Sequence, residues 1–138
     1  NVTTSDTNEY LTVPFDSVLK STFAGSDFNT STHTFTAPEE GYYFINCSLY
    51  HTSLNDTPGQ YQVRISSSTD WADGGAIAFR NHFPDSSVTT VHTHRLDRIA
   101  HLSGSDEIKI TLRPIASAGS YGKITGRPHV SYLTIHKL

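Results

Sequence analysis

The chain has a single cysteine, no methionine and few charged residues. One cysteine excludes an intrachain disulfide, and the missing methionine indicates a mature or excised fragment. Lysine and arginine number 10 against 13 aspartates and glutamates, a formal net charge of -3, so the basic excess of nucleic-acid-binding proteins is missing. No apolar run approaches the ~20 residues of a transmembrane helix. Neither nucleic-acid binding nor membrane insertion is therefore expected.

The length of 138 residues suits one domain. A chain of this size should bury roughly 68–70% of its unfolded surface, which is enough for an independent core. No repeat, linker or low-complexity segment divides it. We therefore expect a single domain over residues 1–138, with residues 1–9 as a loose N-terminal lead-in.

Strand-like periodicity recurs along the chain, whereas helical periodicity is nowhere convincing. Short runs that alternate apolar and polar residues are separated by clusters rich in glycine, proline, serine and asparagine. These features predict an all-β protein, folded as an antiparallel sandwich. The expected strands lie within residues 10–18, 33–37, 41–52, 59–66, 75–83, 88–99, 106–112 and 129–138.

Two of these runs carry apolar side chains on both faces, although a sandwich strand needs only one. In residues 41–52 one face holds Tyr43, Ile45, Cys47 and Leu49, and the opposite face also holds aromatic residues. If the last run pairs with this one, the second faces form one exposed patch, which is typical of an interaction surface. A loop of the same chain is the alternative cover, but self-association explains the patch better. The predicted interface residues are Tyr42, Phe44, Asn46, Tyr50 and Tyr132.

Cys47 shares the parity of Tyr43 and Leu49 in this run. A free cysteine in such a position behaves as a small hydrophobic residue. We therefore expect a buried, unreactive thiol.

The segments "VPFDSV" and "FNTSTHTFTAPEEGYYFI" resemble the complement one-q and tumour necrosis factor jelly-roll family. The pattern of that family runs V-x-F-N/D, then F-N/D, then F-T-x-P-x-x-G-x-Y. "LSGSDEIKI" is similar to the L-x-x-G-D-x-V turn of the family, with the glycine displaced by one to Gly104. The end, "SYLTIHKL", resembles the closing strand. The residues that match the first pattern are Val13, Phe15, Asp16, Phe28, Asn29, Phe35, Thr36, Pro38, Gly41 and Tyr43.

This resemblance implies a ten-stranded jelly roll that forms a tight homotrimer. The long strand and the last strand would lie in the inner sheet around the three-fold axis, so sister subunits would cover the aromatic patch. The sequence also resembles the head domains of phage fibres and virion proteins. The expected function is a non-enzymatic recognition head that binds a protein or glycan receptor, extracellularly or on a virion surface. A secreted animal domain is the alternative.

His92 and His94 stand two residues apart in "VHTHRLDR", a spacing at which two imidazoles can bind one metal. The metal hypothesis places a transition metal on the trimer axis; the alternative is two solvated or hydrogen-bonded histidines. A cupin-like metalloenzyme would need a glutamate a few residues later, where this chain has Arg98 and Ile99. Apolar residues of both parities occur here, so a bulge is also considered.

The only tryptophan, Trp71, lies between Asp70 and Asp73 in the turn "STDWADGG". A tryptophan in a polar loop can stack on a sugar or anchor a protein partner, and it can equally close the end of the sandwich. These three residues are the ligand-binding candidates. Acidic pairs such as Asp106 and Glu107 could hold Ca2+, although no dedicated calcium loop is present.

Overall fold

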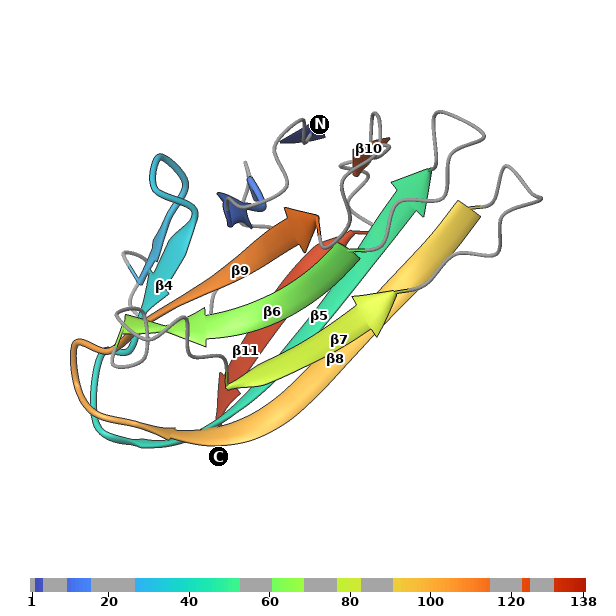
Figure 1. Ribbon diagram of the computed structural model, residues 1–138. Helices are drawn as coiled ribbons and strands as arrows, with labels where there is room; N and C mark the ends of the chain where they lie inside the picture. Colours follow the sequence, from blue (N-terminus) through green and yellow to red (C-terminus); the bar gives the residue numbers. More distant parts are fainter. Residues whose placement is uncertain are drawn as a thin grey trace.

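The fold is a sandwich of two antiparallel sheets, as the computed structural model in Figure 1 shows. The structure describes residues 2–3, 10–15, 27–52, 61–68, 77–82, 91–114, 123–124 and 131–138. Within these ranges there are eleven strands and no α-helix, and no helix in them is long and apolar enough to cross a membrane. The prediction of an all-β antiparallel architecture is confirmed.

The first sheet is built around β5 (Gly41–Thr52). β8 (Val91–Leu102) pairs with one edge of β5 along its whole length. The other edge is shared by β11 (Tyr132–Lys137) and β10 (Lys123–Ile124), and β1 (Val2–Thr3) pairs with β10. The expected pairing of the long strand with the last strand is therefore confirmed.

The second sheet has β9 at its centre, with β6 and then β7 on one side. β4 and β2 occupy the other edge of β9 at different heights, and β3 pairs with β4. Every pair in this sheet is antiparallel. The bounds are β2 Leu11–Thr12, β3 Phe28–Asn29, β4 Thr34–Thr36, β6 Tyr61–Ser67, β7 Ala78–His82 and β9 Glu107–Pro114.

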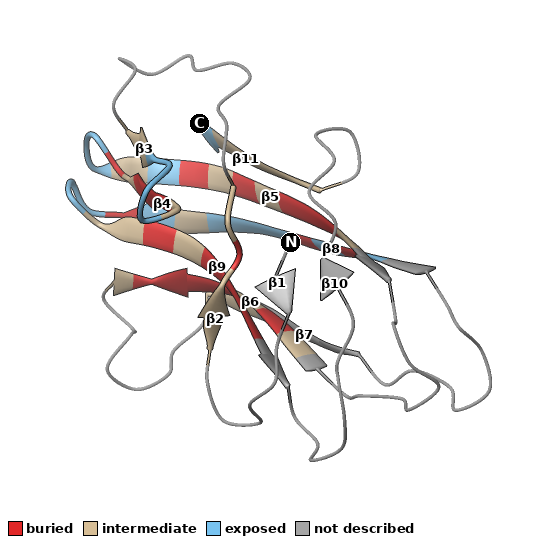
Figure 2. Cartoon of the chain, turned by 90° about the horizontal axis from the view of Figure 1, so that it is seen from above, coloured by how far each residue is buried: buried red, intermediate tan, exposed pale blue. Residues whose placement is uncertain are grey.

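The core lies between the sheets and is formed by alternate residues of the long strands (Figure 2). Fully burying one such apolar side chain contributes roughly 1.5–3 kcal/mol, so these positions hold the sheets together. The inward face expected for residues 41–52 is confirmed, because its four apolar residues are all buried. The buried apolar residues are Val13, Phe35, Ala37, Tyr43, Ile45, Cys47, Leu49, Val63, Ile65, Leu96, Leu102, Ile108, Ile110 and Leu112.

The described ranges contain eleven strands where the family resemblance implied ten, and β1, β2, β3 and β10 are only two residues long. The run predicted over residues 10–18 shows how such a short strand ends. β2 covers Leu11–Thr12, and the Val13 N–H still donates to the Ile110 carbonyl at 2.8 Å. Pro14 follows, and a proline has no N–H with which to extend the ladder.

Candidate interaction face

The side of the first sheet that points away from the second sheet is called the outer face here. Residues that pair directly in an antiparallel ladder project to the same side, so the register defines this face. Tyr42 lies opposite His101 on β8, and Phe44 lies between Ile99 of β8 and His136 of β11. Further along β5 the same face has Asn46 with Asp97 and Thr134, Ser48 with Arg95 and Tyr132, and Tyr50 with Thr93.

None of the five residues predicted at a subunit interface is buried in the single chain. Tyr42 is 59% exposed, and the other four are partly exposed. All five lie on β5 or β11, so the structure brings them together on the outer face. Their part in an interface between subunits stays a prediction.

One end of the outer face is apolar and exposed. Tyr42, Ile99 and Leu138, at 59%, 55% and 69% exposed, are the large hydrophobic residues that the described part of the chain exposes. Ile99 lies beside Phe44 in the ladder, and the Leu138 N–H donates to the Tyr42 carbonyl at 2.9 Å. This cluster of Tyr42, Phe44, Ile99 and Leu138 is called the apolar end. It gathers the large exposed hydrophobic residues of the described structure, as an interaction surface does.

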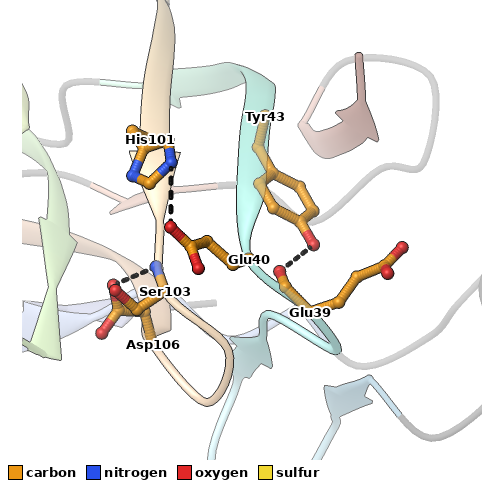
Figure 3. A network of polar contacts seen from close by, with 6 residues as sticks. All are labelled: Glu39, Glu40, Tyr43, His101, Ser103 and Asp106. Carbon is orange, nitrogen blue, oxygen red and sulfur yellow. Dashed lines mark hydrogen bonds and ion pairs between the residues drawn. The ribbon is translucent and has the colours of Figure 1, made fainter.

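Polar contacts order the two turns beside the apolar end, the one before β5 and the one after β8 (Figure 3). The Tyr43 hydroxyl donates to the Glu39 carbonyl at 2.7 Å, which fixes the turn before β5. His101 Nε2 lies 3.5 Å from Glu40 Oε1 across from the same turn. In the turn after β8, the Ser103 N–H donates to Asp106 Oδ2 at 2.8 Å. Asp106 therefore has a local structural role in this turn.

The C-terminal strand is fastened to the same turn by Lys137. Its Nζ lies 2.6 Å from Glu39 Oε1. Its aliphatic stem crosses Gly41 so closely that a Cβ there would lie 2.6 Å from Lys137 Cε. A side chain at position 41 would therefore require the Lys137 stem to move.

His94 lies on the opposite side of the first sheet from the apolar end. It is 4% exposed and pairs in the ladder with Leu49, which is in the core. Only the backbone pairing of His92 with His51 is described, so the His92 side chain lies outside the described structure. Because His94 faces inward, it does not contribute to a metal site on the outer face. No three His, Cys, Asp or Glu side chains gather into a metal site among the residues described.

The other sequence candidates have different outcomes. Asp70, Trp71 and Asp73 lie outside the described residues, so a ligand site there stays a prediction. Cys47 is 0% exposed, as expected. Burial raises the pKa of the Cys47 thiol, because the charged thiolate is poorly solvated in the core.

Sequence reasoning missed several residues of the outer face, namely His101, Ile99, His136 and Leu138. The two parities of apolar residues in β8 suggested a bulge, but β8 pairs with β5 without interruption from Gly41 to Thr52. Leu96 and Leu102 face the core, while Ile99 is simply exposed. The register with β5 was needed to see this.

Comparison with known proteins supports the fold. No protein-family model matches the sequence, and no curated protein matches it. Among solved structures, the chain is similar to "Eiger TNF from S. frugiperda", with a TM-score of 0.60 and 14% sequence identity. The match covers 80% of this chain and 67% of that chain. At this identity the likeness shows the fold alone: the chain is a jelly-roll β-sandwich of the tumour necrosis factor type.

Proposed function

We propose that the domain is a non-enzymatic binding head that works as a homotrimer, with the outer faces of three copies packed together. The observation that carries this proposal is the apolar end, exposed on the central strand of the first sheet and its neighbours. Burial of such a patch against other copies removes apolar surface from water. Each Å2 of apolar surface buried stabilises the assembly by about 25 cal/mol. The fold and the family resemblance of the sequence both support this arrangement.

Three identical copies around one axis would present three identical sets of loops. Such a head can raise the avidity for a surface-bound ligand by ~10^2 or more without new contacts. We propose the loop with Asp70, Trp71 and Asp73 as the contact with a protein or glycan receptor, because a tryptophan supplies a large amphipathic surface. The rigid sandwich would hold the three loops at fixed distances.

A binding head of this kind would act outside the cell or on a virion surface. Within this proposal, a phage or viral fibre head and a secreted animal domain remain the two versions. Asn29 separates them, because it is exposed and begins an Asn-Thr-Ser sequon. A glycan on Asn29 in the protein from its natural source would favour the animal version, and an unmodified Asn29 would favour the phage version.

Mass in solution tests the proposal directly. Light scattering or sedimentation at micromolar concentration should give three times the mass of one chain, and a monomer would overturn the trimer. A glycan and cell-surface binding screen should then identify a ligand. The Trp71→Ala variant should keep the trimer mass and lose binding, whereas a variant that binds normally would move the proposed contact elsewhere.

A further inference from the structure

Two histidines lie within the apolar part of the outer face. His101 pairs with Tyr42 in the ladder, and the two rings form an edge contact with centroids 4.9 Å apart and planes at 70°. His136 pairs with Phe44 on the other side of β5. Both histidines are exposed in the single chain. Packing of a second copy on the apolar end would therefore also cover these two imidazoles.

The two histidines differ in the charged groups around them. His101 has Glu40 at 3.5 Å, with side chains 47% and 72% exposed respectively, and Tyr42 faces it from β5. Because this ion pair is solvent-exposed, Glu40 stabilises a protonated His101 only weakly.

His136 has no charged group opposite it in the described ladder. Phe44 faces it from β5, and Thr134 and Leu138 lie two positions away on its own strand. The adjacent Lys137 forms an ion pair with Glu39. Among the outer-face residues whose side chains are described, the other charged ones are Asp97 and Arg95, which pair with Asn46 and Ser48 further along β5.

We propose that His101 and His136 make self-association through the outer face dependent on pH, with the trimer favoured at neutral pH and dissociated in mild acid. This inference rests on the proposed function. Histidine is the side chain that ordinarily changes charge between about pH 5 and 8. A neutral imidazole can be covered by an apolar surface, whereas a covered imidazolium loses its water. His136 has only Phe44 opposite it to replace that water, and His101 has the solvent-exposed Glu40.

The direction follows from proton linkage. If the assembled face favours neutral imidazoles, association releases the protons that the free chains hold, and lower pH therefore opposes association. Two histidines from each of three copies multiply the effect. We expect the concentration at which half of the chains are assembled to rise at least ~10-fold between about pH 7.5 and 5.5.

Sedimentation equilibrium at both pH values, at one ionic strength, tests this inference. The matched variant carries His101→Gln and His136→Gln, which keep a polar side chain and remove the titration. The readout is the ratio of the association constants at the two pH values, whatever the affinity of the variant at neutral pH. This ratio should be large for the wild type and should fall toward one for the variant. Circular dichroism must show that both proteins stay folded in acid.

The outcomes separate this inference from the proposed function. A wild-type protein that is a monomer at about pH 7.5 overturns the homotrimer, and this inference with it. A trimer that persists equally at both pH values overturns only the pH dependence. A double variant as pH-sensitive as the wild type shows that other groups are responsible, and it also overturns the inference. His33→Gln, in the turn between β3 and β4, serves as the control and should keep the wild-type ratio.

Discussion

Tyr42 and Tyr43 are neighbours in the sequence, yet they lie on opposite faces of β5 with exposed fractions of 59% and 0%. Tyr43 packs on Phe35 with ring centroids 6.0 Å apart and donates its hydroxyl hydrogen to the Glu39 carbonyl. Tyr42 contacts the His101 ring on the outer face. One strand thus serves both the core and a surface that the single chain leaves open, and substitutions at alternate positions should have different consequences.

Phe44→Asp should dissociate the trimer. Phe44 lies between Ile99 and His136 in the middle of the proposed contact, and an aspartate there would be covered without a partner. The sedimentation mass at micromolar concentration should fall to that of one chain. The far-UV spectrum should stay that of a β-protein, because Phe44 is not part of the core.

Thr32→Asp is the matched control for this substitution. Thr32 is exposed in the turn between β3 and β4, away from the outer face, so the same added charge should leave the mass unchanged. If the Phe44→Asp protein still sediments as a trimer, the interface lies on another surface.

Tyr43→Phe should destabilise the fold by about 0.5–1.5 kcal/mol, the usual contribution of one hydrogen bond. The ring would stay in the core, and the bond to the Glu39 carbonyl would be lost. Urea unfolding under conditions that keep the protein monomeric measures the change. Tyr42→Phe is the control and should have almost no effect, because Tyr42 is exposed. Equal losses in the two variants would contradict the role given to the Tyr43 hydroxyl.

The sequence was sufficient for the features that depend on strand period. The expected strand over residues 41–52 matches β5, and its alternation correctly separated Ile45 and Leu49 from Phe44. The pairing of β5 with β11 agrees with the family resemblance, which implied that the long strand and the last strand lie in one sheet. Period-2 patterns are informative where one face is fully buried, since burial then tolerates few exceptions.

The features that depend on pairing register could not be predicted. In β8, Leu96 and Leu102 have one parity and Ile99 has the other. The sequence alone does not tell which of these two faces points to the core. The inward position of His94 could not be predicted for the same reason. A His-x-His spacing places two residues on one face of a strand, but it does not say which face. The position of Leu138 beside Tyr42 arises from a tertiary contact at the chain end.

Ser105→Gly should stabilise the protein by up to about 1 kcal/mol. Ser105 has a φ of 77°, a left-handed conformation that costs a residue with a Cβ roughly 1–2 kcal/mol and costs glycine little. Its N–H bond to the Ala37 carbonyl, at 2.9 Å, uses only the backbone and would remain. The greater flexibility of glycine in the unfolded chain offsets part of the gain.

Thermal or urea unfolding of Ser105→Gly measures this gain, and Gly104→Ala is the comparison. A Cβ at position 104 would lie 3.7 Å from Glu39 Cα, an ordinary contact, so we expect that variant to be tolerated. Destabilisation by Ser105→Gly would mean that the serine side chain contributes to the turn beyond its backbone.

Cys47 should be unreactive in the folded protein. It is 0% exposed, and burial raises the pKa of its thiol above the ordinary value of 9.0, so the nucleophilic thiolate does not form near neutral pH. Labelling with a thiol reagent at about pH 8 should be ~100-fold slower than in denaturant, because it requires opening of the core.

The same burial of Cys47 predicts a stability trend at high pH. Above about pH 9.0 the unfolded chain loses the thiol proton and the folded chain keeps it, so the free energy of unfolding contributed by Cys47 is complete below that pH and declines above it. Cys47→Ala removes this contribution. The stability difference between wild type and Cys47→Ala should therefore shrink as the pH rises from about 8 to 10. A difference that stays constant would show that the thiol titrates alike in both states.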